Sequence, residues 1–524
     1  MNFIMSILIF LSVFFSFEGQ ANSAQNPNFF CGKYLGSLPI QQRGRTKPLY
    51  VHAKEVMKFL TGKTTFNGLD AVTNYCLLNV KGMEIPVTIS LATPIEHVDL
   101  KKILDFKEKQ KTITFEELQD YKQELRIASV KNSDETSLGK AVKKTIQKLN
   151  LYEAVVSGSN WLLPETTVDL KGNKLISWIP VSSFLTEDKI IELKSSSSDP
   201  FKELFLQAQR RYIEIEGDLH LTELKFSKLK LPIINLILCL FTLIFLMASP
   251  KKMFWKILCG VLVSGQITYV IFRVMISGRA PITNMYETVM FSGFAALLLG
   301  LFIGYYKKDK TPALLGLVYN ALTLMMQNFS GSMLSPQISP LVPVLRDNFW
   351  LSTHVTTVII SYGAYALSWV LANIVLIKSR FFTISKEEIK HSIELIYSCL
   401  KYGSILLAAG LLLGGVWADF SWGRFWGWDP KETWSLIVLC LYMAILHGRY
   451  TSWISNGLFI PLVALAFLSV MMAWFGVNYI LATGLHSYGF SEGGAIFLGS
   501  FFLIQIVIVA ITFNGSKTRL IASN

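Results

Sequence analysis

The chain has 524 residues, of which 52% are hydrophobic and only 16% are charged. A soluble globular chain carries about 25% charged residues, so this composition excludes an ordinary soluble protein. The formal net charge is +13. The basic residues of the second half lie in short loops between apolar stretches, and no Lys/Arg run with interleaved aromatic residues predicts a nucleic-acid partner.

The first 21 residues have the pattern of a secretory signal peptide. An apolar core from Phe3 to Phe17 is too short to span a membrane easily, and Gly19-Gln20-Ala21 offers a small-x-small cleavage site. No Lys or Arg precedes the apolar core, so an uncleaved anchor is the alternative. Either version exports the segment that follows.

Residues 22–230 are mixed in polarity and are predicted to form a mainly α extracytoplasmic domain. Amphipathic helices are expected at 52–61, 99–127 and 138–150, and a loop at 194–198. Cys31 and Cys76 lie in this part, where a disulfide is chemically permitted, but the sequence does not show that they meet. No CxxC occurs, which disfavours thioredoxin-type exchange and structural zinc.

Residues 231–513 read as about nine membrane spans of roughly 20 apolar residues each, followed by a tail at 514–524. The expected spans are 231–249, 254–273, 287–305, 312–328, 350–377, 402–418, 433–447, 459–480 and 494–513. The predicted fold class is therefore an all-α polytopic membrane protein. The four cysteines of this half are expected to be small buried hydrophobes, namely Cys239, Cys259, Cys399 and Cys440.

Loop charges predict the orientation of these spans. If residues 22–230 lie outside, fourteen cations fall on the cytoplasmic side and five on the outer side. The fourteen are Lys251, Lys252, Lys256, Lys307, Lys308, Lys310, Lys378, Arg380, Lys386, Lys390, Lys401, Arg449, Lys517 and Arg519, and the five are Arg273, Arg279, Arg346, Arg424 and Lys431. We therefore expect a multi-pass protein of the cytoplasmic (inner) membrane whose C-terminus is cytoplasmic.

A tryptophan-rich loop at 417–434 is expected on the outer, periplasmic side. It reads Trp-Ala-Asp-Phe-Ser-Trp-Gly-Arg-Phe-Trp-Gly-Trp-Asp-Pro-Lys-Glu-Thr-Trp and holds five of the chain's twelve Trp residues. An interfacial aromatic belt explains one or two Trp residues per loop. Five of them, interleaved with glycines and charges, favour a binding surface instead.

A large planar ligand fits this composition. Trp422 and Trp426 would share one face of a helix, Gly423 and Gly427 would permit close approach, and the nearby cations can pair with carboxylates. Heme has the matching shape, because it combines a broad apolar macrocycle with two propionates and a metal that takes axial imidazoles. The cations concerned are Arg424 and Lys431.

Three of the seven histidines have settings suited to heme iron. His354 lies just inside the outer end of its span and His486 lies in an outer loop, so both are candidate axial ligands. His447 lies about 21 Å deeper than Thr433 along a helix, toward the inner leaflet, where an ionisable residue is a functional candidate. A role as an interfacial anchor is the alternative for His447.

The remaining histidines receive weaker predictions. His52, His97 and His391 are expected to be ordinary surface residues, and His220 is a weak candidate only.

The tryptophan-rich run resembles the "WWD" signature of heme-handling proteins, most closely the CcsA (ResC) type of system II cytochrome c biogenesis. Two further stretches are similar to outer-loop motifs of that family: 277–287, which contains Arg279 and Glu287, and 340–350, which leads into His354. The resemblance covers roughly residues 250–515. A stretch at 38–50 is similar to a segment of some extended members, whereas ordinary members lack so large an exported domain.

This resemblance implies roles by matching position. His354 and His486 would ligate heme b iron beside the WWD loop, of which Trp422, Trp426, Trp428 and Asp429 are part, and His447 would ligate iron while heme enters from the cytoplasmic side. Other implied partners are a CcsB (ResB)-type membrane subunit, apocytochrome c and thiol-reducing proteins, in contact with membrane lipid. The implied activity is that of a holocytochrome c synthase subunit, a heme lyase that presents heme to a CxxCH segment for thioether formation.

Three other functions stay open at this point. A heme exporter or chaperone of the system I type would keep heme but lack synthase activity. An electron-transfer cytochrome b usually carries two histidines on one span, and no predicted span here holds two. A transporter or scaffold would use the Trp residues only as an interfacial belt.

Overall fold

The computed structural model describes residues 31–42, 44–82, 89–107, 110–132, 136–185, 199–248, 253–331, 333–340, 348–481 and 493–521. Contacts divide the chain into two compact units, Met1–Lys228 and Leu229–Asn524, here called unit 1 and unit 2. The predicted signal peptide and the predicted loop at 194–198 lie outside the described residues.

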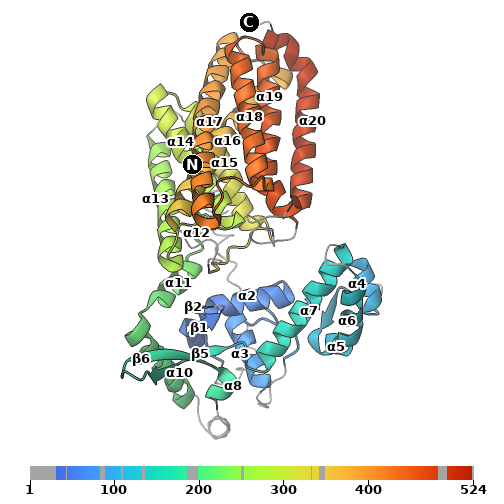
Figure 1. Cartoon of the computed structure of the whole chain (residues 1–524), viewed down its shortest axis with the longest axis vertical. Coiled ribbons are helices and arrows are strands. Elements are labelled where there is room, and N and C mark those ends of the chain that lie inside the picture. The colour runs from blue at the N-terminus through green and yellow to red at the C-terminus, as the bar shows by residue number, and fades with distance from the viewer. Residues whose placement is uncertain are drawn as a thin grey trace, which may run out of the picture. The chain divides into compact units, whose positions relative to one another are not determined.

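Unit 1 is mainly helical (Figure 1), and its described residues form three two-stranded antiparallel sheets. Its helices are η1 (Lys33–Ser37), α2 (Leu49–Thr61), α3 (Ala71–Lys81), α4 (Val98–Ile103), α5 (Phe115–Asp120), α6 (Lys122–Lys131), α7 (Ser137–Val156), α8 (Val181–Phe184), α10 (Asp199–Glu216) and α11 (Leu219–Lys228). The sheets pair β1 (Pro39–Gln42) with β2 (Arg45–Pro48), β3 (Ala92–Pro94) with β4 (Thr112–Thr114), and β5 (Leu162–Val168) with β6 (Lys174–Pro180).

The predicted helix at 99–127 is wrong as one element. Asp105 takes a left-handed backbone conformation (φ 50°) just after α4, which ends that helix. Thr114 then begins α5 with a capping box, because its side chain accepts from the Glu117 amide while Glu117 binds the Thr114 amide in return. Local capping chemistry therefore overrides the apolar spacing that predicted a continuous helix.

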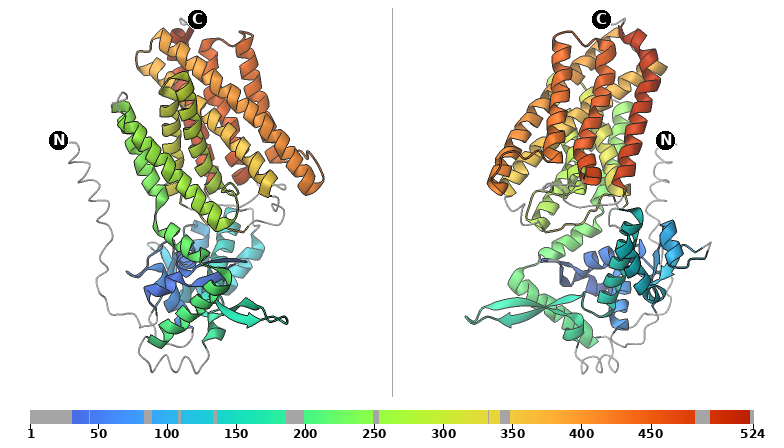
Figure 2. Two further views of the ribbon diagram at one scale, coloured as in Figure 1. Left: turned by 90° about the vertical axis from the view of Figure 1, so that its left-hand side faces the viewer. Right: turned by 45° about the vertical axis from the view of Figure 1, so that its right-hand side comes forward.

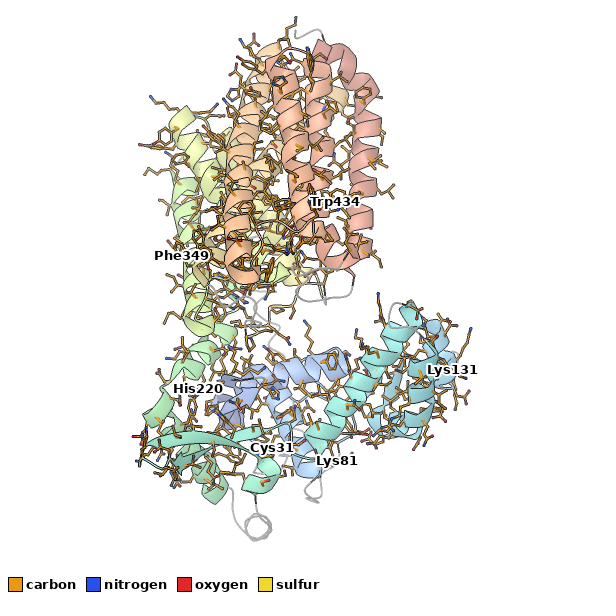
Figure 3. All side chains as sticks on the ribbon, viewed as in Figure 1. Cys31, Lys81, Lys131, His220, Phe349 and Trp434 are labelled. Atoms are coloured by element: carbon orange, nitrogen blue, oxygen red, sulfur yellow. A yellow bond between two sulfur atoms is a disulfide. The ribbon has the colours of Figure 1, made fainter. Side chains whose placement is uncertain are left out.

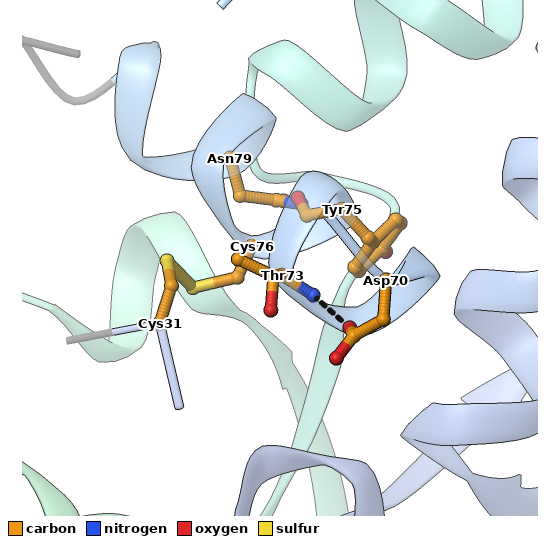
Figure 4. Close-up of a disulfide and its surroundings, with 6 residues drawn as sticks. All are labelled: Cys31, Asp70, Thr73, Tyr75, Cys76 and Asn79. Carbon is orange, nitrogen blue, oxygen red and sulfur yellow. Dashed lines mark hydrogen bonds between the residues drawn. A yellow bond between two sulfur atoms is a disulfide. The ribbon is translucent and has the colours of Figure 1, made fainter. Parts of the chain in front are cut away.

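A disulfide joins Cys31, just before η1, to Cys76 on α3 (Figure 4). The Asp70 side chain caps α3 by accepting from the Thr73 amide at 2.9 Å. Ten of the eleven residues of α3 are buried, so this helix lies at the centre of unit 1. The cross-link closes a loop of 45 residues onto that centre and restricts the unfolded chain.

His52 is a core residue rather than the surface residue that was predicted. Its side chain is fully buried on α2, and its ring nitrogens lie 3.2 Å from Gln42 Oε1 and 2.8 Å from Asn160 Oδ1. These contacts connect the first hairpin to the segment before β5. Buried polar groups of this kind are stable because they are hydrogen-bonded.

Unit 2 is a helical bundle (Figure 2). Its helices are α12 (Leu231–Ala248), α13 (Phe254–Ser277), α14 (Met285–Lys307), α15 (Thr311–Phe329), α16 (Asn348–Phe381), α17 (Lys386–Trp422), α18 (Pro430–Tyr450), α19 (Asn456–Met471) with the π-helix η3 (Met472–Leu481), and α20 (Gly494–Ile521). Each predicted span coincides with one of these helices. In the described part of the chain, seven helices are long and apolar enough to cross a membrane, and α15 and α18 are not among the seven.

The protein is thus an all-α polytopic membrane protein, but several helix ends differ from the prediction. Helix α17 has 37 residues, begins well before 402 and ends slightly past 418, so that the irregular part of the tryptophan-rich loop shrinks to 423–429. Cys440 was expected to be buried but is exposed on α18. Its position suits a lipid-facing side chain.

Helices α16 and α17 pack closely along their length. Glycines on α17 permit this, because a methyl group added at Gly410 would lie 2.6 Å from a methyl carbon of Val358 on α16. Small residues let helix backbones approach in membranes, where no hydrophobic force drives helices together. Near the end of the same contact, Gly414 faces the ring of His354, whose Cδ2 would lie 3.5 Å from an added methyl group.

We predict that unit 1 loses stability as the pH falls from 6.5 toward 4. Burial and the neighbouring Lys47 charge lower the pKa of His52 to about 3, and burial lowers the pKa of His220, on α11, to about 4 (Figure 3). In that window the unfolded state binds more protons than the folded state. Each histidine therefore lowers the free energy of unfolding by about 2 kcal/mol at pH 5 relative to pH 7.

Urea-dependent pulse proteolysis of the detergent-solubilised chain at pH 7 and pH 5 measures this loss. His52→Gln should remove about half of the difference between the two pH values. An equal loss in wild type and His52→Gln would contradict the assignment.

Candidate functional site

A cavity opens at one end of unit 2, between the first turns of α14, α16 and α18, the last turns of α17, and η3. Its cavity volume is about 140 Å³. Ligand pockets of small molecules and cofactors commonly have mostly apolar walls. The walls here are predominantly apolar, with a few polar groups described below.

His354 is the only histidine among the described residues that line this cavity. Its Nδ1 donates to the backbone carbonyl of Trp350 at 2.8 Å, one helical turn earlier. A ring nitrogen that donates to a carbonyl fixes the tautomer, so in the neutral ring the lone pair is on Nε2. The ring is held against Trp417, whose centroid lies 5.0 Å away at an interplanar angle of 26°.

The tryptophans of the predicted loop differ in whether they line the cavity. Trp426 lines the cavity, as does Trp417 at the end of α17. Trp422 packs edge-on against Trp417, with centroids 4.7 Å apart at 68°, and Trp428 is largely exposed. Trp422 ends α17 while Trp426 lies in the loop, so the expectation that they share one helix face is wrong.

The Asp-Pro-Lys-Glu part of the motif begins a helix. Asp429 caps α18 by accepting from the amides of Lys431 and Glu432, both at 2.9 Å, and Pro430 occupies the first helical position. Glu432 reaches back and accepts from the Gly427 amide at 2.7 Å. This capping box fastens the loop to α18, so Asp429 has a structural role here.

The two cations of the loop have different surroundings. Lys431 lines the cavity beside Glu432. The Arg424 guanidinium lies 3.9 Å from Glu432 and over the Trp422 ring. It crosses so close to Gly427 that an added methyl group there would overlap it. A side chain at position 427 would therefore force the Arg424 guanidinium to move.

A buried ion cluster forms a second part of the site. Glu287, in the first turn of α14, is fully buried and accepts from Arg273 Nη2 at 2.7 Å and from Arg279 Nη1 at 3.0 Å. The backbone amide and the hydroxyl of Thr283 donate to the same carboxylate at 2.9 and 3.0 Å. Two of the five outer cations predicted from the sequence are therefore neutralised in part by one carboxylate.

The two arginines also hold the segment 333–340. Arg273 donates to the carbonyl of Pro336 and Arg279 to that of Ser339, each at 3.1 Å. Thr283 and Asn284, next to the cluster, line the cavity. The motif at 277–287 therefore fastens a wall of the cavity to the segment that precedes α16.

The sequence analysis missed the contribution of η3. Trp474 and Asn478 of this π-helix line the cavity, and the indole N–H of Trp474 donates to the Thr288 hydroxyl on α14 at 3.1 Å. π-Helical segments occur often at functional sites. In the sequence, the polar Asn478 in an otherwise apolar span was the feature that could have indicated this part of the site.

The other predicted histidines lie elsewhere. His447 is exposed at the far end of α18, with Trp453 edge-on at 6.1 Å. His486 and Arg346 lie outside the described residues, so their placement stays a prediction. His220 is buried in unit 1 against Tyr212 and has no part in this cavity.

The part of the chain that forms this cavity is similar to proteins of known families. Residues 282–486 match the family model described as "Cytochrome C assembly protein". The chain is 35% identical over 243 residues to the cytochrome c biogenesis protein CcsA of Guillardia theta, which covers 41% of this chain and 78% of that protein. It is 33% identical over 277 residues to CcsA of Prochlorococcus marinus, covering 46% and 87% respectively.

A longer relative matches both units. Protein NrfI of Wolinella succinogenes is 28% identical over 522 residues, which covers 90% of this chain. The chain spans only 56% of NrfI. Because 90% of the chain is matched, this similarity extends well into unit 1, whereas the CcsA proteins match less than half of the chain.

We predict that Glu287→Gln strongly destabilises unit 2, because it leaves two buried arginines without their carboxylate. Breaking a buried ion pair in this way costs about 3–5 kcal/mol. Thermal unfolding in detergent should show a clearly lower Tm. Glu388→Gln breaks an exposed pair with Lys378 of the same 2.7 Å length and should change stability by less than about 1 kcal/mol. Equal melting of both variants would refute a stabilising role of the cluster.

Proposed function

Because this chain belongs to the CcsA family of cytochrome c biogenesis proteins, we propose that it binds heme b in the cavity of unit 2 and presents it for covalent attachment to apocytochrome c. Heme is the substrate in this proposal. The supporting observation is the juxtaposition of an oriented imidazole with indole rings in one cavity, namely His354 with Trp417 and Trp426.

The walls of the cavity match the parts of a heme. Indole and aliphatic side chains suit the macrocycle, and the Nε2 lone pair of His354 suits the iron. Lys431 is the cation of the cavity wall and is a candidate partner for a propionate. Arg424 is engaged with Glu432 and Trp422, so its role in this proposal is to shape the loop. His486 is proposed as the second axial ligand.

The attachment reaction needs no nucleophile from this chain. The two thiols of a CxxCH segment add across the heme vinyl groups: each S–H bond breaks, a C–S bond forms, and the hydrogen passes to the other vinyl carbon. The addition is therefore redox-neutral. What the protein contributes is ligation of the iron and orientation of the macrocycle next to the incoming peptide.

His447 is proposed to meet heme on the cytoplasmic side. It belongs to an exposed stripe of α18 that also contains Ile437, Leu441 and Ala444, spaced three and four residues apart. An imidazole facing lipid is costly, and a partner helix on this stripe would both cover it and supply the second ligand. We propose a CcsB-type subunit as that partner.

The orientation proposed from loop charges agrees with these features. The end of the bundle that carries the cavity would face the periplasm, and the His447 end would face the cytoplasm. The Cys31–Cys76 disulfide of unit 1 supports an oxidising location for that unit. The proposed membrane is the cytoplasmic membrane.

Substitution of His354 tests the ligand assignment. The chain is co-expressed with its CcsB-type partner and a CxxCH reporter, and covalent heme is scored on a denaturing gel beside the absorption spectrum of the purified complex. His354→Ala should lower bound heme several-fold and shift the Soret band, and His486→Ala should do the same. His391→Ala, an exposed histidine paired with Asp309, is the control.

Unchanged heme content and spectrum in both variants would refute the assignment. Bound heme without any covalent reporter product, in wild type, would instead favour a heme exporter or chaperone.

A second substitution tests the entry role of His447. His447→Ala should lower heme delivery to the reporter, and added imidazole should restore part of it, because free imidazole can replace the missing ligand. Delivery equal to wild type would remove this role. Failure of imidazole rescue, with lower Tm, would indicate that His447 acts only in stability.

A further inference from the structure

A groove lies between α14 and α17, near the C-terminal end of α14. Both helices pack against α16, whereas few contacts join them to each other. The groove has a volume of about 270 Å³ and is lined by Phe302, Ile303, Tyr306, Lys307 and Tyr402. Because α14 rises 1.5 Å per residue, the groove lies about 25 Å along this helix from the cavity that contains His354. It is therefore a separate recess.

The walls of the groove are two exposed stripes of mostly apolar side chains. On α14, Leu298, Phe302 and Tyr306 are spaced four residues apart, so they share one face of the helix. On α17, Tyr402 and Ile405 are exposed three residues apart. Both helices are long and apolar enough to cross a membrane. Exposed apolar faces of such helices contact lipid, so lipid is the surrounding medium of this groove.

One end of the groove is polar. The Lys307 ammonium, in the last turn of α14, donates to the Ser398 hydroxyl on α17 at 3.0 Å and so bridges the two helices. Lys308 follows it and is exposed. On α17, Lys401 is also exposed, with its ammonium 5.1 Å from the centre of the Tyr397 ring. Three cations thus accompany this end of the groove.

Nearby carboxylates leave this positive charge in excess among the described residues. The Asp309 carboxylate accepts from Thr311 and lies 2.9 Å from His391, so it is engaged elsewhere. Glu394 lies one helical turn before Ser398, and the interaction given there is through its backbone carbonyl. One carboxylate therefore stands against three lysines, which makes this end complementary to an anion.

The order of these groups along the helices matches a phospholipid. The spans predicted at 287–305 and 402–418 end where the cations begin, so Lys307 lies at the level of the lipid headgroups and Phe302 lies deeper. An interfacial belt explains exposed tyrosines in general. It does not explain a recess between two helices that a lysine bridges at its polar end. Basic pockets between membrane helices are typical sites for phosphate headgroups.

We propose that this groove binds one anionic phospholipid, whose phosphate pairs with Lys307 and whose acyl chain lies along Phe302 and Tyr402. A zwitterionic headgroup carries its own cation beside the phosphate, so it gains less from the excess of lysines. The site therefore selects lipids by the charge of the headgroup. This inference rests on the membrane class of the chain and is independent of heme binding.

Lipid titration of the purified full chain tests the headgroup contact. The chain in mild detergent is titrated with phosphatidylglycerol or phosphatidylcholine of the same acyl chains, and bound lipid is counted by native mass spectrometry. Wild type should bind one phosphatidylglycerol about fivefold more tightly than phosphatidylcholine, because a lysine at the surface favours an anionic lipid by about that factor. Lys307→Gln should remove most of this preference, and Lys307→Arg should keep it.

Lys386→Gln is the matched control for charge. It removes an exposed lysine at the start of α17 and should change the preference less than about twofold, since Lys386 does not line the groove. Equal affinity of wild type for the two lipids would overturn the proposal. An equal loss of preference in Lys307→Gln and Lys386→Gln would also overturn it, because the effect would then come from the general surface charge.

A second substitution tests the apolar part of the groove. Phe302→Ala removes an exposed wall, so it should weaken the binding of both lipids about threefold or more and leave the preference between them unchanged. Phe329→Ala, at the exposed end of α15, is the control and should bind like wild type. An unchanged Tm shows that each variant is folded. Lipid affinity in Phe302→Ala equal to wild type would place the lipid outside this groove and overturn the proposal.

Discussion

The burial of Glu287 between Arg273 and Arg279 is the constraint on which the site depends. Burying a carboxylate without compensating cations would carry a prohibitive free-energy cost. The same two arginines also donate to the carbonyls of the segment before α16. One ion cluster thereby fixes the end of α13 and the start of α14 to a segment about 60 residues further along the chain. The cavity keeps its shape because none of these pieces can move without exposing a charge to an apolar surrounding.

A second glutamate plays a parallel part at the start of α18. Glu287 and Glu432 each occupy the third position of their helix, after an Asn or Asp cap. Each accepts backbone amides from the segment that enters the helix. Charged residues in the first turn also interact favourably with the helix dipole. The family-like motifs at 277–287 and 423–432 therefore combine a helix start with a cavity wall, which explains their mixture of small, charged and aromatic residues.

Between these walls, the position of His354 follows from packing. The glycines of α17 bring α16 close, Trp417 supports the imidazole face, and the Trp350 carbonyl selects the tautomer. An imidazole that is oriented before its ligand arrives loses little entropy on binding. The same arrangement would serve any role in which iron must be held and later released to another histidine.

The amino-acid sequence was enough to predict the membrane class and the positions of the nine helices described in unit 2. Hydrophobic length, charge asymmetry and Trp density are local properties, so they can be read along the chain. The three-dimensional structure was needed to show that Trp417 and Trp474 line the cavity while Trp428 is exposed, that Cys31 meets Cys76, and that Glu287 binds two arginines. Cys31 and Cys76 are 45 residues apart and Trp474 meets Thr288 across 186 residues, whereas Arg273 and Arg279 lie 14 and 8 residues from Glu287. At either separation, no local pattern specifies which side chain will satisfy a buried charge, because the fold decides which side chains meet.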